Sequence, residues 1–408
     1  MSTKTYDVVL FGATSFVGQI LARYLLEEFG CNGRLRWAAA GRSRPKLEAV
    51  RAGLGEGARQ LPLLVADAAD LDALRKLCRQ SRLVVSTVGP YALHGEPLVR
   101  ACAETGTDYC DLTGEIQWIR RMIATYERQA QESGARIVHC CGFDSIPFDL
   151  GVHFLQREAQ ARYRQPCTTV KMRVKSMRGG FSGGTFASIM NIVKEVAADP
   201  ALRRQLADPY ALCPAGYAPR VRQHEVRFAE YDADFSAWTA PFIMGALNTR
   251  LVQRTNALQQ QAYGPEFRYD EAVLTGRGLR GQATAAAVSA GLAAFMGAGA
   301  IGPARKLLTR FLPAPGEGPS PEAQRKGGYD LRFLGRTNDG RTLRVRVTGD
   351  RDPGYGSTAK MLGQAAACFV EDVPAGVPGG FWTPASIFGD LLLPRLQKSA
   401  GMTFAVLE

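Results

Sequence analysis

Residues that can bind a pyrophosphate lie near the N-terminus, in the stretch YDVVLFGATSFVGQILAR at 6–23. Gly12 and Gly18 flank a short loop between an apolar run typical of a buried strand and a pattern typical of a helix. The N–H groups at the start of such a helix point outward, and the helix dipole adds positive potential, so together they favour an anion. Gly12 permits a tight turn, and Gly18 permits close packing of helix on strand. We expect the loop to bind a dinucleotide through Gly12, Ala13, Thr14, Ser15, Phe16, Val17 and Gly18.

Ser15 occupies the place of the middle glycine in the pattern G-x-x-G-x-x-G. Serine is small and its hydroxyl can still donate to a phosphate oxygen, so the change weakens the motif and preserves its chemistry. The loop lies between a predicted strand and a predicted helix, which is the context that the motif requires. The alternative is an ordinary βαβ turn without a ligand.

The second predicted strand, at 35–40, should end beside the ribose of the adenosine. An acidic residue there would bind the 2′-hydroxyl of NAD, but this chain has Gly41, Arg42 and Ser43. An arginine with a serine can instead bind a 2′-phosphate through charge-assisted hydrogen bonds. We therefore predict NADP, used as NADPH, as the cofactor. The alternative is that Arg42 and Arg44 are solvated loop charges.

Two further strand ends should approach the cofactor. Asp67 follows a strand at 61–66 and can accept from the adenine amino group or cap the helix that starts near Asp70. Ligands of doubly wound sheets lie outside the carboxyl ends of the strands. The end of the strand at 83–87 is therefore expected near the nicotinamide, with Thr87, Gly89, Pro90 and Tyr91.

Three side chains are candidates for donating a proton beside the nicotinamide. Tyr91 follows the fourth strand and can protonate an enolate or stack on the ring. His94 carries an imidazole, which can act as an acid or a base, but it can equally cap the next helix. Asp144 follows a strand at 136–141 that should end at the cleft, but it can equally form a turn. Structural roles are assigned to Asp111 and Glu115, in the turn before Ile116, and to His139, in the core.

Five segments carry a resemblance to a known family: GATSFVG, AGRS, VVSTVGPY, TDYCDLTGE and GFDSIPFDLG, in this order. Over 5–155 they closely resemble the NADP-binding domain of saccharopine dehydrogenase-like oxidoreductases, and the resemblance extends more loosely to Thr383-Pro-Ala385. The chain is most similar to the branch that includes the trans-acting enoyl reductases of phthiocerol and phenolic glycolipid biosynthesis. The same branch includes eukaryotic saccharopine dehydrogenase-like proteins found with membranes and lipid droplets.

The resemblance implies an α/β fold with an N-terminal Rossmann domain, whose doubly wound parallel sheet occupies 1–155. It implies a second, α+β domain for substrate binding and dimerisation at 156–350, and a C-terminal segment, 351–408, that returns to the first domain. The patterns agree with this division, since 168–176 alternates like a strand and 329–349 reads as a hairpin across Asn338-Asp-Gly340. A homodimer is expected.

Composition limits the class of function. The net charge of +12 suits phosphorylated cofactors, anionic lipid surfaces or acidic substrates. The basic residues are scattered and form no nucleic-acid motif, so nucleic acid is not an expected partner. Nine cysteines without C-x-x-C or metal-type spacing predict reduced thiols, no metal and a cytoplasmic location. The first strand follows the N-terminus at once, so no signal peptide is expected.

An uncharged stretch at 282–304 precedes a basic, amphipathic segment, Arg305–Leu312. Its length suits a bilayer span, but its Ala- and Gly-rich composition gives weak insertion. For the apolar helical segment 283–312, three placements stay open: peripheral contact at the inner face of a membrane, a true span, or a buried or dimer-forming helical hairpin.

The second domain offers two further candidate binding features. Gly179–Thr185 can form an anion or substrate-carbonyl site at a helix start, or a turn capped by Thr185. The stretch Tyr231–Asn248, with Trp238, Phe242 and Met244, can line an apolar pocket or form core.

The sequence has no S-x-x-x-Y-x-x-x-K signature and no metal constellation, which argues against a short-chain dehydrogenase and a zinc alcohol dehydrogenase. Three functions remain open. The first is NADPH-dependent reduction of an enoyl C=C in a lipid-like or polyketide-derived substrate, a choice that the resemblance supplies. The second is a saccharopine-type reduction of an imine. Its substrate carries carboxylates and would need convergent arginines, for which Arg173, Arg178, Arg220 and Arg222 are available. The third is a non-catalytic, NADP-bound protein at a membrane.

Overall fold

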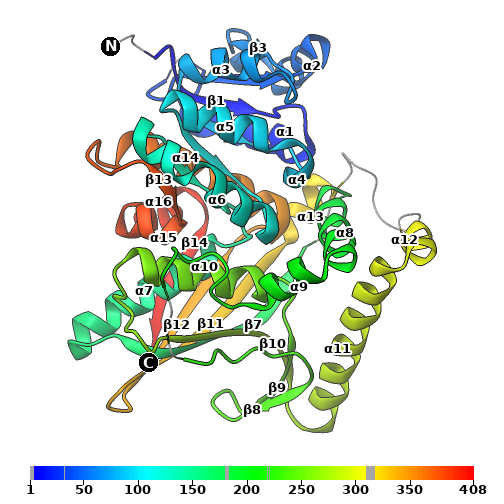
Figure 1. Ribbon diagram of the computed structural model, residues 1–408, viewed down its shortest axis with the longest axis vertical. Helices are drawn as coiled ribbons and strands as arrows, with labels where there is room; N and C mark the ends of the chain where they lie inside the picture. The colour runs from blue at the N-terminus through cyan, green and yellow to red at the C-terminus, as the bar shows by residue number, and fades with distance from the viewer. Residues whose placement is uncertain (1–3, 32, 180–182, 218, 220, 309–317) are drawn as a thin grey trace.

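Two seven-stranded sheets form the framework of the computed structural model (Figure 1). The structure describes residues 4–31, 33–179, 183–217, 219, 221–308 and 318–408. In Figure 1 the first sheet lies in the upper part of the molecule and the second in the lower part. The predicted combination of a Rossmann domain with a second α+β domain is confirmed.

The first sheet is entirely parallel and contains the 3-2-1-4-5-6 strand order typical of dinucleotide-binding folds. In spatial order its strands are β13 (Gly380–Trp382), β6 (Arg136–Val138), β5 (Asp108–Asp111), β4 (Ser81–Ser86), β1 (Tyr6–Phe11), β2 (Trp37–Gly41) and β3 (Leu63–Val65). In β1, Val8 and Leu10 face one core, whereas Val9 and Phe11 face the other. Both faces are therefore buried, as an apolar parallel strand requires.

Helices cover both faces of the first sheet. They are α1 (Phe16–Phe29), α2 (Arg44–Leu54), α3 (Leu71–Arg79), α4 (Tyr91–His94), α5 (Glu96–Thr105), α6 (Ile116–Ser133) and α14 (Thr358–Glu371), with a short η1 (Glu56–Ala58). Helices α1 and α14 pack together on one face, and α3, α5 and α6 pack on the other. Helix α14 and strand β13 come from the C-terminal segment, so this part of the chain returns to the first domain as the resemblance implied.

The second sheet is mixed. Its strands, in spatial order, are β14 (Met402–Leu407), β12 (Thr342–Gly349), β11 (Gly328–Thr337), β7 (Cys167–Arg178), β10 (Arg268–Gly276), β9 (Ala237–Pro241) and β8 (Glu230–Asp232). Strands β7 and β10 are parallel, and the other neighbours are antiparallel. The predicted hairpin, β11 with β12, and the predicted strand β7 are confirmed.

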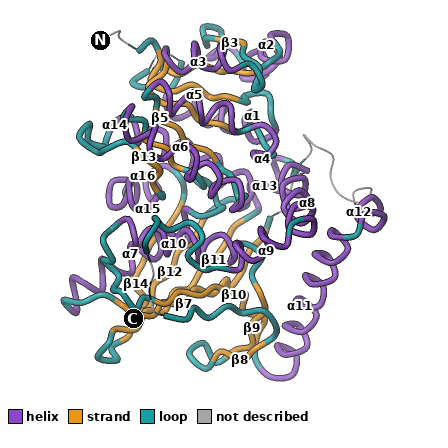
Figure 2. Tube along the Cα trace, viewed as in Figure 1, coloured by secondary structure: helices purple, strands orange, loops and turns teal. Residues whose placement is uncertain are grey.

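Helices of the second part surround this sheet. They are α7 (Ile146–Tyr163), α8 (Gly183–Ala198), α9 (Pro200–Ala207), α10 (Gly245–Leu258), α11 (Gly278–Ala300), α12 (Gly302–Leu308), α13 (Pro321–Lys326), α15 (Pro384–Ile387) and α16 (Gly389–Ser399), with the turn η2 (Pro353–Ser357). Figure 2 shows α7 and α10 on the side of the second sheet that faces the first. Arg254 of α10 donates to the carbonyl of Phe381 in β13 at 2.6 Å, which joins the two parts.

Helix α7 has no counterpart in the sequence analysis, and it crosses the expected boundary at residue 155. Its first half is buried on nearly all sides, with Phe148, Leu150 and Val152 beside the polar Asp149, so it lacks an amphipathic period. Strand β14 departs from the expectation that all of 351–408 packs on the first domain. Its alternating Met402 and Phe404 are buried against the second sheet instead.

Helix α11 runs along the edge of the molecule, at the lower right of Figure 1. It is long and apolar enough to cross a membrane by length and composition, with a mean hydropathy of 1.5, yet only 17% of that window is buried. The buried positions include Gly281, Ala285 and Ser289, one narrow stripe that contacts β9 and β10. A hairpin buried within the chain is therefore wrong for 278–300, whereas a dimer-forming hairpin stays a prediction. Residues 309–312 of the predicted amphipathic segment lie outside the described residues.

Candidate functional site

The glycine loop has the backbone geometry expected of a phosphate-binding turn. Gly12 has φ +93°, and a Cβ there would lie 2.7 Å from Val88 Cγ2. A Cβ at Gly18 would lie 2.1 Å from the carbonyl oxygen of Gly12, because α1 starts directly against the end of β1. Both positions thus exclude any side chain, one through conformation and the other through close approach. Between them, residues 13–14 form the turn, Ser15 precedes α1, and Phe16 and Val17 begin the helix.

Ser15 has a structural role that the sequence did not reveal. It is the N-cap of α1, and its Oγ accepts from the N–H of Gly18 at 2.9 Å. Its Oγ also lies 3.0 Å from Thr87 Oγ1, which donates to the carbonyl of Gly12 at 2.9 Å. One of the two hydroxyls donates to the other. The serine therefore ties the glycine loop to the end of β4, where the nicotinamide was expected.

The end of β2 offers a cation without a partner. Arg42 is exposed and forms no hydrogen bond or ion pair with any described residue. Arg44 is engaged instead, since its Nε donates to Glu48 at 2.8 Å. Ser43 precedes α2 and its hydroxyl makes no capping bond. Arg42 and Ser43 are therefore both available to a phosphate, next to the buried Gly41.

Asp67 does not cap α3, which was one of the two roles that the sequence allowed. Asp70 caps α3 by accepting from the N–H groups of Asp72 and Ala73, at 3.1 Å and 3.0 Å. Asp67 accepts from Ala69 N in the preceding turn at 2.9 Å. It is exposed after β3, at the edge of the sheet that holds Arg42.

A cavity of about 500 Å³ adjoins the glycine loop. Its lining includes Ser15, Phe16, Val17, Thr87, Gly89 and Tyr91, which were all predicted to contact the cofactor. The rest of the wall is largely apolar and comes from segments spread along the chain: 112–116, 143–144, the end of β7 with Gly179, α8, 242–247, η2, Thr358 and one residue of α11. Phe242 and Met244 contribute as predicted, whereas Trp238 packs on Tyr231 in the second sheet. Pro90 lies just before α4, follows Gly89 through a cis peptide bond, and does not line the cavity.

Asp144 is the one acidic residue among the described lining residues. The pKa of its carboxyl is raised to about 7, mainly by burial and also by the nearby Asp111 charge, against a hydrogen bond from the residue's own backbone. The side chain keeps partial exposure toward the cavity while protein surrounds its other sides. A carboxyl with this pKa is protonated in a large fraction of molecules at neutral pH, so it can donate a proton.

The two other candidate donors are placed less favourably. Tyr91 is 3% exposed, and its hydroxyl already donates to the carbonyl of Ser86 at 2.9 Å. Burial holds the pKa of Tyr91 well above its usual value, so its proton is not readily released. His94 ends α4 on the surface and is not among the lining residues. Of the three, Asp144 alone presents a free acidic group to the cavity.

Glu115 does more than form a turn. Its carboxylate accepts from the N–H groups of Tyr91 and Ala92, at 2.8 Å and 2.9 Å, and so caps α4 from a distant part of the chain. The same carboxylate accepts from Ser188 Oγ of α8 at 2.9 Å. Burial raises the pKa of Glu115 despite these bonds. Glu115 thus joins the start of α4, at the edge of the first sheet, to α8, which forms the opposite wall of the cavity.

Asp111 and His139 form a buried pair beneath the site. His139 Nδ1 lies 2.7 Å from Asp111 Oδ2, and Asp111 also accepts from Tyr109 and from the N–H groups of Thr113 and Cys140. Asp111 therefore serves the turn, as predicted, and in addition fixes the end of β6. His139 is a core residue, but its Nε2 has no partner among the described residues.

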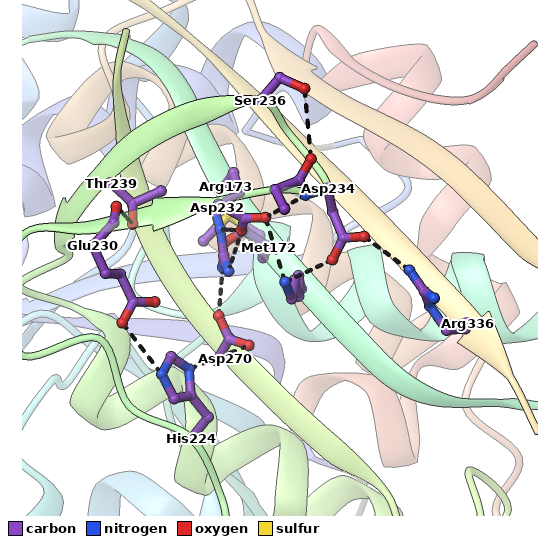
Figure 3. Close-up of polar contacts among 12 residues, drawn as sticks. Met172, Arg173, His224, Glu230, Asp232, Asp234, Ser236, Thr239, Asp270 and Arg336 are labelled. Carbon is purple, nitrogen blue, oxygen red and sulfur yellow. Dashed lines mark hydrogen bonds and ion pairs between the residues drawn. The ribbon is translucent and has the colours of Figure 1, made fainter. Parts of the chain in front are cut away.

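The arginines proposed for a polycarboxylate substrate do not converge on the cavity. Arg173 is 1% exposed in the second sheet, where ion pairs of 2.7 Å and 2.5 Å join it to Asp232 and Asp270 (Figure 3). Arg178 and Arg222 are exposed, and Arg220 lies outside the described residues. No Arg or Lys occurs among the described lining residues. The Gly179–Thr185 feature lies partly outside the described residues, although α8 does begin there.

Comparison with known proteins agrees with this geometry. Residues 8–138 match the saccharopine dehydrogenase NADP-binding domain. A trans-acting enoyl reductase of Mycobacterium ulcerans is 38% identical over 97% of this chain and 96% of its own. One of Mycobacterium bovis is 37% identical over 96% of each chain. A Mycobacterium tuberculosis protein with a provisional name of the same kind is 40% identical over 97% of this chain and 96% of its own.

The chain belongs to the saccharopine dehydrogenase-like family, in the branch of the trans-acting enoyl reductases. Saccharopine dehydrogenase from Saccharomyces cerevisiae shares the fold, with a TM-score of 0.54 and 15% identity over 99% of this chain and 100% of that one. NADP is the cofactor of the first domain. The residues present fit it: the glycine turn leaves room that any Cβ would fill, and Arg42 with Ser43 suits the 2′-phosphate.

Proposed function

We propose that this protein is an NADPH-dependent reductase of the enoyl C=C bond in an apolar, lipid-like or polyketide-derived substrate. The observation that carries the proposal is the cavity, which adjoins the glycine loop, is largely apolar, and has one acidic side chain and no basic one among its described lining residues. A neutral acyl group suits such a wall. A substrate with several carboxylates would lose its hydration there without gaining a cation.

NADPH supplies the hydride to the β-carbon of the enoyl group when it is bound. Asp144 in its protonated form donates the proton that the α-carbon takes up, which completes the addition of two hydrogens across the double bond. The apolar wall excludes water from the cavity and favours the neutral carboxyl of Asp144. Arg42 and Ser43 hold the 2′-phosphate, while Gly12 and Gly18 let the backbone approach the pyrophosphate.

The test is oxidation of NADPH by the purified protein with hexadecenoyl thioester as acceptor, followed by nicotinamide fluorescence. Asp144→Asn keeps the size of the side chain and removes the acidic proton. We expect it to lower kcat by about 100-fold or more while NADPH binding stays unchanged. Tyr91→Phe is the matched variant, because it removes the hydroxyl that already donates to Ser86, and it should keep most of the activity. Full activity in Asp144→Asn would exclude the assigned donor.

We also propose that α11 lies in the interface of a membrane, on its cytoplasmic side. Leu279 is 84% exposed and Ile301, just beyond the helix, is 60% exposed, so a lipid surface would bury apolar area that water now contacts. Cations flank the helix, with Arg277 and Arg280 at its start and Arg305 shortly after its end. Such residues can reach anionic headgroups while the helix lies flat.

Co-sedimentation with vesicles tests this placement. We expect the protein to bind phosphatidylglycerol vesicles more than phosphatidylcholine vesicles, and Leu279→Glu with Ile301→Glu to abolish binding. Leu93→Glu is the control, since Leu93 is 60% exposed on α4, far from α11 in sequence. Binding that persists in the double variant would refute the proposal. A dimer that dissociates in the double variant, without vesicle binding by the unaltered protein, would show that a second copy covers α11 instead.

A further inference from the structure

Met296 belongs both to the cavity and to the outer surface. It lies on α11, yet it lines the cavity that adjoins the glycine loop. At the same time, Met296 is 40% exposed. A side chain with both properties lies where the cavity reaches the outside of the protein. It is also the one residue of α11 among the described lining residues.

Helix α8 leads from the reacting end of the cavity to this point. Ser188 binds Glu115 at the first sheet, and Ile189, Ile192 and Val193 line the cavity beyond it on the same helical face. Val193 lies about 8 Å along the helix from Ser188. There α8 meets α11, because a Cβ on Gly299 would lie 3.1 Å from Val193 Cγ1. The row of apolar side chains therefore ends at the contact between α8 and α11.

This contact is close, but it is apolar and built from flexible groups. Met190 Cε lies 3.2 Å from where a Cβ of Gly299 would be, and the rings of Phe186 and Phe295 are 6.2 Å apart. Methionine side chains adapt to different neighbours without polar cost. A hydrocarbon chain can therefore pass beside Met296 without breaking a hydrogen bond.

The reacting end of the substrate fixes the direction of its tail. The lining includes Thr87 and Gly89, where the nicotinamide is expected, and Asp144, the proposed proton donor. The enoyl group must lie between them. A tail that continues from there runs along the apolar face of α8 toward Met296.

We propose that the apolar tail of the substrate leaves the cavity between α8 and α11, and that Met296 sets how long a tail the enzyme accepts. This inference rests on the proposed function, because it assigns a tail to the same enoyl substrate. Short substrates stay inside the cavity and do not reach Met296. Long substrates pass it, so the side chain at position 296 affects the binding of long substrates only.

The experiment compares crotonyl and hexadecenoyl thioesters of N-acetylcysteamine as acceptors of the full-length enzyme with NADPH. Met296→Trp places a larger, stiffer side chain at the opening. We expect kcat/KM for the hexadecenoyl thioester to fall by about tenfold or more, and that for the crotonyl thioester to change by less than about twofold. Val288→Trp is the matched control, because Val288 is 39% exposed on the same helix and does not line the cavity. It should leave both substrates unaffected.

Each outcome decides the point. Equal losses for both substrates in Met296→Trp, or no loss for either, would overturn the proposal, and so would the same selective loss in Val288→Trp. Failure of the proposed function looks different: the unaltered enzyme would then reduce neither thioester. In that case a binding measurement tests the tail path, with the neutral methyl ester of 11-dansylamino-undecanoic acid as the fluorescent probe. Its affinity should fall in Met296→Trp and not in Val288→Trp, and equal affinities would refute the tail path.

Discussion

The choice between NADPH and NADH tests the role of Arg42 most directly. Arg42→Ala removes a guanidinium that has no partner among the described residues, so the folded protein loses no internal contact. A hydrogen bond to a charged group contributes about 1.5–3 kcal/mol, and exposure to solvent and salt places this one toward the middle of that range or below. A loss of about 2 kcal/mol corresponds to roughly a 30-fold higher Kd for NADPH. NADH lacks the 2′-phosphate, so its Kd should change by less than about twofold.

The assay is titration of the purified protein with each nucleotide, followed by nicotinamide fluorescence, at low and high salt. The matched control is Arg44→Ala, because Arg44 lies two residues away and is already paired with Glu48 at 2.8 Å. An exposed ion pair of this kind contributes little, so Arg44→Ala should leave NADPH binding within about threefold. Equal losses of NADPH and NADH affinity in Arg42→Ala would refute the assignment. So would a loss in Arg44→Ala as large as that in Arg42→Ala.

Two further predictions concern the loop and the proton donor. Gly12→Val should abolish binding of both nucleotides, because Gly12 has φ +93° and a Cβ would lie 2.7 Å from Val88. Gly53→Ala is the control: nothing lies within 4 Å of its Cβ, so this variant should bind both nucleotides normally in the same titration. Activity should also depend on pH: Asp144 is ionised above its pKa of about 7 and cannot then donate, so kcat/KM should be level below that pH and fall about tenfold per unit above it. A profile that rises with pH would mean that the ionised form acts instead.

The cofactor loop was predictable because its determinants are local. The strand, the two glycines and the helix start lie within one short stretch, and each glycine is required by the backbone beside it. The same holds for Arg42, which follows its strand directly. What the sequence could not show was the use of the Ser15 hydroxyl, because its partner Thr87 is distant in the chain and close only after β1 and β4 pair.

The rest of the candidate site depends on packing between remote segments. Asp144 can be a turn residue by its sequence context, and the pKa of its carboxyl is raised by burial and by the Asp111 charge, which only the folded chain brings about. Glu115 reads as a turn residue as well, but its bond to Ser188 crosses from the first sheet to α8. Helix α7 escaped prediction because burial on most sides removed its amphipathic period. A single sequence carries no sign of these contacts.

The absence of a basic residue from the described cavity wall separates the two reductase hypotheses on physical grounds. An imine formed between an amino acid and a keto acid brings carboxylates next to the reacting carbon. A carboxylate buried without a cation or several hydrogen bonds costs several kcal/mol, enough to prevent binding. Arg173, in the second sheet, was a candidate partner for such a carboxylate, but its charge is already neutralised by Asp232 and Asp270. Asp144 would add repulsion when ionised. A neutral enoyl thioester meets none of these costs, since its tail needs only apolar contact and its α-carbon needs one proton.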